Sequence, residues 1–275
     1  MDTSKVSDVL RQIEAFDLSD AEKDVLLFAY MLKRGLNEHF PSILDRAADR
    51  KSCNDRLNAA IQLVKGEKWG MCQHGMIQRL ETRFSEAEKS EISGKLRSMS
   101  DLLRDKLGID CFITSGTLLG LIREGKFLAH DFDFDMAYIS RKMEKSAIAE
   151  ERREVVDVIN RSEHFRITNP FTDKVQVKFQ IGGQEVYMDL FVAYRSGQFF
   201  NEVPLKPDTL PIDDVVPLKT MSLYGVDVFV PKFPEKLLEI NYGPSWKVPD
   251  PSFRFNFGEH AAQYWFLHKT PISPT

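Results

Sequence analysis

The clearest structural signal in the chain lies in residues 115–139, SGTLLGLIREGKFLAHDFDFDMAYI. Residues 117–124 predict a short helix that ends at Gly125, since glycine commonly terminates helices. Residues 131–136 then alternate acidic with apolar side chains, a period of two that is typical of a half-buried strand. We therefore expect a helix followed by a strand that has one apolar and one acidic face.

Three acidic side chains follow this alternation. Since side chains i and i+2 of a strand lie on one face, about 7 Å apart, we expect Asp131, Asp133 and Asp135 to lie together. Carboxylates this close repel one another and are costly to desolvate. Mg²⁺ or Mn²⁺ would relieve both costs, because such ions bind carboxylate oxygens together with substrate phosphates. The alternative is an exposed strand end whose acids face water.

The turn before the helix has the composition of a phosphate site. Ser115, Gly116 and Thr117 lie between a β-rich segment, residues 109–114, and the helix. Their backbone N–H groups and hydroxyls can meet a phosphate at the helix N-terminus. Arg123, on the same helix, can clamp a phosphate through its forked guanidinium.

A fourth acid, Asp189, lies inside an otherwise apolar strand at residues 186–192. Charges in such positions are seldom left unpaired, so a metal or a basic partner is expected beside it. An ion pair with an arginine or lysine is the alternative to a metal. Lys178, on the preceding strand, either faces the acids or forms a surface ion pair.

The remaining pattern predicts an α+β fold, a small mixed sheet with flanking helices, preceded by a helical N-terminal region. A helix starts at Ser19 and ends before Gly35, and a capping box at Ser85 opens a long helix that Gly108 stops. Hairpins are predicted over 175–194 and 218–230, a helix over 235–242, and an ordered coil after Pro244. We divide the chain into a helical region (1–84), a catalytic domain (85–250) and a packed tail (251–275).

Composition narrows the function classes. The 275 residues carry a net charge of −4, which argues against a globally basic nucleic-acid binder. Three cysteines without a C-x-x-C pair argue against a disulfide framework. The N-terminus has no secretory pattern, and the longest apolar run, residues 25–32, is too short to cross a bilayer, so we expect a cytoplasmic protein. That run must be buried, either on the catalytic domain or in a homo-oligomer.

Two motifs resemble a known family. The segment Gly116-Thr117-Leu118-Leu119-Gly120 with Arg123-Glu124-Gly125, followed by Asp131-x-Asp133-x-Asp135, resembles the LicD/fukutin-related phosphotransferases of the nucleotidyltransferase-fold superfamily. Met188-Asp189-Leu190 matches the third carboxylate of that family, and Tyr242-Gly243-Pro244-Ser245-Trp246 resembles its Tyr-Gly-Trp ending. The resemblance covers about residues 108–250. Ala129-His130 departs from it, since Pro-Trp often stands there.

The resemblance implies a nucleotidyltransferase-like fold and transfer of a phospho-alcohol or phospho-sugar group. The donor would be CDP-linked, and the acceptor a hydroxyl of a glycan or lipid-linked saccharide used for a surface polymer. The resemblance implies that Asp133, Asp135 and Asp189 bind Mg²⁺ or Mn²⁺ and carry catalysis, with Asp189 also accepting the proton. The donor phosphate would be bound by Ser115, Gly116, Thr117 and Arg123. Asp131 and His130 would orient the metal-binding residues. Two alternatives stay open: a nucleotidyltransferase that adds NMP to a small molecule or protein, and an inactive scaffold of the same fold.

Overall fold

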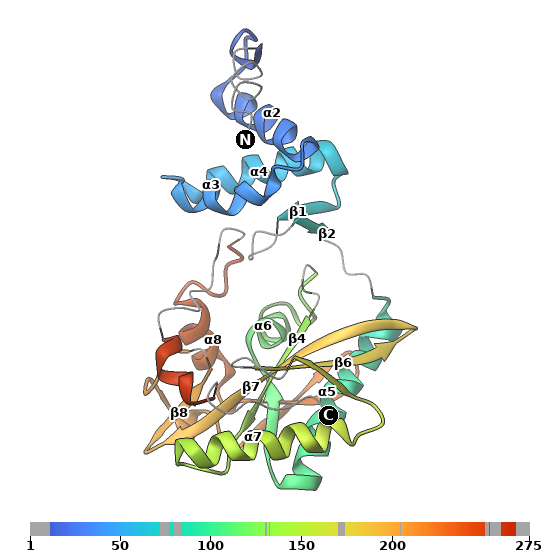
Figure 1. Cartoon of the computed structure of the whole chain (residues 1–275), viewed down its shortest axis with the longest axis vertical. Coiled ribbons are helices and arrows are strands. Elements are labelled where there is room, and N and C mark those ends of the chain that lie inside the picture. The colour runs from blue at the N-terminus through green and yellow to red at the C-terminus, as the bar shows by residue number, and fades with distance from the viewer. Residues whose placement is uncertain are drawn as a thin grey trace. The chain divides into compact units, whose positions relative to one another are not determined.

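The computed structural model describes residues 12–71, 77–79, 84–129, 131, 133–169, 174–203, 205–250, 253 and 260–267. The chain divides into two compact units (Figure 1). An N-terminal unit comprises Met1–Glu81 with Pro249–Phe255, and a larger unit comprises Thr82–Val248 with Asn256–Thr275. No helix among the described residues combines the length and the apolar character needed to cross a bilayer.

The N-terminal unit contains helices and one small hairpin. Its elements are α2 (Asp20–Lys33), a 3₁₀ turn (Asn37–His39), α3 (Phe40–Arg46), α4 (Arg50–Lys65), β1 (Trp69–Met71) and β2 (Ile77–Arg79). The predicted start of α2 is confirmed, because Ser19 and Glu22 form a reciprocal capping box. The predicted helical region is present, and the hairpin β1–β2 within it was not predicted, since strands of three residues are too short to show alternation.

The apolar run of α2 is buried inside this unit. Phe28, Ala29 and Leu32 form a core with Phe40 of α3 and Leu57 of α4. The rings of Phe28 and Phe40 meet edge to face, with centroids 5.9 Å apart. For these α2 side chains, the expectation of burial on the catalytic domain or against a second copy was wrong, because α3 and α4 cover them.

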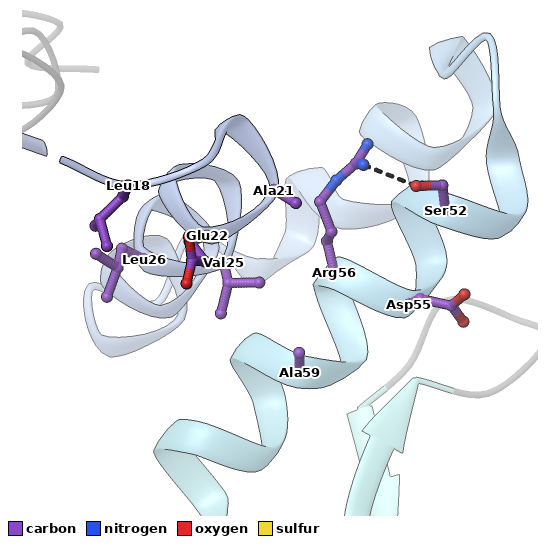
Figure 2. Close-up of a pocket in the computed structure, with 9 residues that line it drawn as sticks. All are labelled: Leu18, Ala21, Glu22, Val25, Leu26, Ser52, Asp55, Arg56 and Ala59. Carbon is purple, nitrogen blue, oxygen red and sulfur yellow. Dashed lines mark hydrogen bonds between the residues drawn. The ribbon is translucent and has the colours of Figure 1, made fainter. Parts of the chain in front are cut away.

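A groove of about 530 Å³ lies between α2 and α4 (Figure 2). The residues that line it are Leu18, Ala21, Glu22, Val25, Leu26, Ser52, Asp55, Arg56 and Ala59. Arg56 donates a hydrogen bond to Ser52 (2.8 Å) and pairs with Asp24 (3.0 Å). The guanidinium of the groove is therefore already balanced by an acid of the same unit.

The larger unit is an α+β assembly. Its elements are α5 (Glu86–Leu107), β3 (Asp110–Ile113), α6 (Ser115–Glu124), β4 (Asp133–Ile139), α7 (Lys145–Asn160), β5 (Arg166–Asn169), β6 (Lys174–Ile181), β7 (Gln184–Ser196), β8 (Phe199–Glu202), β9 (Leu210–Pro211), a 3₁₀ turn (Ile212–Asp214), β10 (Lys219–Leu223), β11 (Val226–Val230), α8 (Pro234–Tyr242) and a 3₁₀ helix (Ala261–Leu267).

Several predicted boundaries in this unit are confirmed and others shift. The capping box at Ser85 and the left-handed Gly108 bound α5 as expected. Helix α6 begins at Ser115, two residues before the predicted start. Strand β4 begins at Asp133, so Asp131 precedes the strand instead of lying in it. The tail, predicted as coil, contains the 3₁₀ helix Ala261–Leu267.

The central sheet is mixed and has seven strands in the order β3-β4-β7-β6-β5, with β8 paired to β7 and β9 to β8. Strands β4 and β7 pair in parallel, and the other pairs are antiparallel. The register of the parallel pair places Asp135 directly opposite Asp189. Two acids that are distant in sequence thus become neighbours at the centre of the sheet.

The two faces of the sheet differ in character. Phe134 and Met136 of β4 and Met188 and Leu190 of β7 point to one face and are buried. Tyr138, which alternates onto this apolar face, lies close enough to Arg152 of α7 to interact with its charge. The opposite face carries Asp133, Asp135 and Asp189, because side chains alternate along each strand.

Candidate active site

The turn between β3 and α6 packs directly against the acids. The backbone N–H of Gly116 donates a hydrogen bond to Oδ2 of Asp135 (2.9 Å). A Cβ atom at position 116 would lie 2.6 Å from Oδ2 of Asp131 and 3.2 Å from Oδ2 of Asp135. Only glycine lets the backbone of the turn approach both carboxylates this closely. Ser115, which precedes it, has a positive φ of 45°.

Thr117 links the helix to the strand. Its hydroxyl oxygen accepts the backbone N–H of Asp135 (2.8 Å), and the residue is buried. This bond fixes the N-terminal turn of α6 on β4. The hydroxyl predicted to contact the donor phosphate thus accepts a hydrogen bond from β4 within a buried residue.

The acids form one electrostatic group. Burial raises the pKa of Asp135, and the charges of Asp133 and Asp189 raise it further. Burial likewise raises the pKa of Asp131, and the charges of Asp135 and Asp133 raise it further. Asp131 therefore lies with the strand acids although it precedes β4. His130, predicted to support the ligands, lies outside the described residues.

Asp189 is held by two side chains of β6. Its Oδ2 forms an ion pair with Nζ of Lys174, and Nε2 of Gln176 donates to its Oδ1 (3.4 Å). Thr168 of β5 donates to the amide oxygen of Gln176 (2.9 Å), which turns the Gln176 NH₂ group toward Asp189. Asp189 is only 1% exposed. Burial raises the pKa of Asp189, and the Lys174 charge opposes that rise.

The donor set suits a hard divalent cation. As the side chains stand, no three histidine, cysteine or acidic side chains among the described residues are arranged to hold a metal ion. Mg²⁺, however, is commonly bound by one or two carboxylates, and water and substrate phosphates supply the other ligands. Asp133 and Asp135, adjacent on one strand face, meet that smaller requirement, and the Gly116 N–H orients one of them.

The other residues near the acids come from α6 and α8. Arg123 pairs with Glu124 (2.9 Å) and donates to the carbonyl of Trp246 (3.5 Å), so its guanidinium is held by protein acceptors. Burial raises the pKa of the Tyr242 hydroxyl, and the charges of Asp135 and Asp131 raise it further. Tyr242, from the Tyr-Gly-Pro-Ser-Trp segment, is therefore brought next to the acids.

A buried carboxyl group, that of Glu202, contacts the residue before the Gly116 turn. Glu202 of β8 is 1% exposed, and its Oε1 accepts a hydrogen bond from the hydroxyl of Thr114 (2.6 Å). Thr114 directly precedes the turn formed by Ser115, Gly116 and Thr117. Burial raises the pKa of Glu202 to about 8, and the Thr114 bond opposes the rise.

Comparison with protein families assigns this part of the chain. Residues 108–233 match the family model described as LicD/FKTN/FKRP, nucleotidyltransferase domain. The chain contains a LicD-family domain. No curated protein matches the chain. The family points to transferase chemistry of the phosphotransferase type in glycan modification.

The LicD-family segment includes the Gly116 turn, the four acids and the residues that hold Asp189. Sequence reasoning found the turn and the acids but missed Lys174, Gln176, Glu202 and Tyr242 as neighbours of the site. Alternation along β6 was the available signal, since Lys174, Gln176 and Lys178 share the face of Asp189. Lys178 itself forms an ion pair with Glu185 (2.6 Å), the surface role named as its alternative.

Proposed function

We propose that this protein is a metal-dependent phosphotransferase that moves a phospho-alcohol or phospho-sugar group from a CDP-type donor to a glycan hydroxyl. The product would decorate or extend a surface polysaccharide. The observation that carries the proposal is the pairing of Asp135 with Asp189 across β4 and β7, with Asp133 on the same face and the Gly116 N–H on Asp135. The LicD-family segment supports the reaction class.

Asp133 and Asp135 would bind Mg²⁺ or Mn²⁺. The bound cation would neutralise charge on the donor phosphates and on the leaving group. Asp135 is oriented by the Gly116 N–H. Asp131 packs against the same glycine and would orient its neighbours. Asp189 completes the acidic group from β7 and is held there by Lys174 and Gln176.

The acceptor hydroxyl would attack the phosphorus that carries the alcohol. A P–O bond to the acceptor forms, the P–O bond to the bridging oxygen breaks, and CMP leaves with that electron pair. The hydroxyl proton passes to a carboxylate of the sheet face. The sequence predicted Asp189 as the proton acceptor, but Asp189 is 1% exposed and pairs with Lys174, whereas Asp133 is half-buried and more accessible. Ser115 and the backbone of Gly116 would contact the donor phosphate, and Arg123 would do so once released from Glu124.

The test uses the purified full-length chain, Mg²⁺ or Mn²⁺, and a panel of CDP-linked alcohols and sugars. A true donor binds only the native state and raises Tm by mass action. Mass spectrometry of the product with oligosaccharide acceptors then identifies the transferred group. An acceptor mass increased by the phospho-alcohol supports the proposal, and absence of any donor-dependent shift with both metals would contradict it.

A second function is favoured by the description of the matching family segment, which is a nucleotidyltransferase domain. The same acids and turn could transfer NMP to a small molecule or protein. The acceptor would then gain the mass of the NMP group. The leaving group would be pyrophosphate from a nucleoside triphosphate, or the phospho-alcohol from a CDP-linked donor. The same mass measurement separates the two reactions.

A further inference from the structure

A basic side chain lies next to the acids on the polar face of the sheet. Lys174 begins β6 and faces Phe191 of β7, two positions along from the Gln176–Asp189 pair. Its side chain therefore emerges on the same face as Asp189. The ammonium reaches back across the sheet to Oδ2 of Asp189. The charges of Asp133 and Asp135 also act on it.

The backbone of Lys174 is fixed by the strand ladder, and its side chain is partly exposed to solvent. Lys174 pairs with Phe191 in the strand ladder, and Nη2 of the buried Arg152 donates to the carbonyl of Lys174 (3.4 Å). The Lys174 side chain is 34% exposed, whereas that of Asp189 is 2% exposed. A ligand that enters along the polar face thus meets the ammonium before it meets Asp189.

The charge of the proposed donor requires such a group. Asp131, Asp133, Asp135 and Asp189 present up to four negative charges, and a nucleotide diphosphate brings at least two more. One divalent cation leaves this assembly strongly negative. A lysine ammonium is a compact cation with three donors, a common partner for phosphate oxygens.

We propose that Lys174 binds the phosphates of the nucleotide-linked donor, so that its ammonium bridges Asp189 and a phosphate oxygen. The inference deepens the proposed function and rests on it for the identity of the donor. Among the described cations near the site, Arg123 pairs with Glu124 and Lys178 pairs with Glu185, and neither partner is one of the sheet-face aspartates, whereas Lys174 pairs with Asp189 itself. Lys174 is the cation whose charge acts on both Asp135 and Asp189.

The test measures binding to the full-length chain by calorimetry with Mg²⁺ and three probes: inorganic pyrophosphate, CDP and cytidine. For pyrophosphate and CDP we expect Lys174→Met to weaken binding about 10- to 100-fold, the size of a lost hydrogen bond to a charged group. Lys174→Arg should restore most of the affinity. Cytidine affinity should not change. The matched control is Lys178→Met, four residues along the same strand face, which should bind all probes as the wild type does.

Circular dichroism and thermal unfolding verify that each variant is folded. If Lys174→Met unfolds because Asp189 loses its counter-charge, the double variant Lys174→Met/Asp189→Asn is compared with Asp189→Asn alone. The double variant should still bind pyrophosphate about tenfold more weakly. Unchanged pyrophosphate affinity in either comparison overturns the role of Lys174.

The remaining outcomes separate this inference from the proposed function. If the wild type binds pyrophosphate but not CDP, the CDP-type donor is wrong, and the pyrophosphate arm still decides the role of Lys174. If the wild type binds neither probe in the presence of Mg²⁺, the role of Lys174 is overturned. If CDP binds and Lys174→Met does not weaken it, the donor class stands and the role of Lys174 falls.

Discussion

Glu202 makes the stability of the protein depend on pH. Its pKa is raised from the ordinary 4.5 to about 8 in the folded chain. Between these values the folded state keeps a proton that the unfolded state has lost, so the free energy of unfolding falls as pH rises. The contribution of Glu202 to the free energy of unfolding is therefore fully present below about pH 4.5 and is lost above about pH 8.

We expect Glu202→Gln to remove this dependence. Glutamine keeps the oxygen that accepts the Thr114 hydroxyl and cannot ionise. Near pH 5 the variant should be about as stable as the wild type, and near pH 9 more stable, by up to about 5 kcal/mol at about 1.4 kcal/mol per pKa unit. Urea unfolding at both pH values measures the difference. Equal pH slopes in the two proteins would show that Glu202 does not bind this proton.

The crowded acids predict opposite effects on activity and stability. Asp133→Asn and Asp135→Asn should each lower turnover more than about 100-fold, because each removes a proposed metal ligand. Each should also raise Tm without added metal, since Asp133 raises the pKa of Asp135 by charge repulsion. Steady-state assays and thermal unfolding measure the two effects. Near-normal turnover in either variant would remove that residue from the metal site.

Residues that sequence alone reveals are those that share a local pattern. Asp133 and Asp135 alternate along one strand, and Asp189 stands out as the acid of an apolar strand. Lys174 and Glu202 are different, since Lys174 meets Asp189 only through the β6–β7 register, and Glu202 meets Thr114 88 positions away. Alternation along β6 shows only that Lys174 shares a face with Gln176 and Lys178, and the strand pairing decides which of these residues reaches Asp189.

At the level of elements, the Gly116 turn packs directly against the acids of β4 and its N-terminal end. Gly116→Ala should strongly reduce activity and destabilise the fold by about 1–3 kcal/mol, because its Cβ would lie 2.6 Å from the Asp131 carboxylate. Gly94→Ala is the matched control: Gly94 lies within α5, and its Cβ would have no neighbour within 4 Å. That control should keep full activity and gain about 0.5–1 kcal/mol. Calorimetry and turnover assays of both variants test this, and an active Gly116→Ala would disprove the close approach.

The elements that were predicted well from sequence are bounded by characteristic turn residues. Both hairpins were marked by turn residues, Gly182-Gly183 and Tyr224-Gly225, and both are present. Strands β5, β8 and β9 were not predicted, since they have four, four and two residues and no regular alternation of buried and exposed side chains. Short strands take their conformation largely from the strands they pair with, so the pattern of their own side chains carries little information.

At the level of the whole molecule, the N-terminal unit has a core of its own. We expect a chain that begins at Ser85 to fold, because this start keeps the capping box of α5. It should bind Mn²⁺ and donor as the full chain does and lose transfer to the natural acceptor, since we expect the N-terminal unit to shape acceptor access. Calorimetry and the transfer assay test this after circular dichroism verifies the fold. Loss of donor binding in a folded truncation would place part of the donor site in the N-terminal unit.

The parallel pairing of β4 with β7 also has a consequence for synthesis of the chain. Asp189 follows Asp135 by 54 positions, and β7 lies between β4 and β6 in the finished sheet. A nascent chain that has reached only Ile181 already holds the turn and both β4 acids but lacks the strand that completes them. Such long-range pairings form late because loop closure must come first. A ribosome-bound fragment should therefore bind none of the proposed donor until β7 has left the exit tunnel, so incomplete chains would not compete for it.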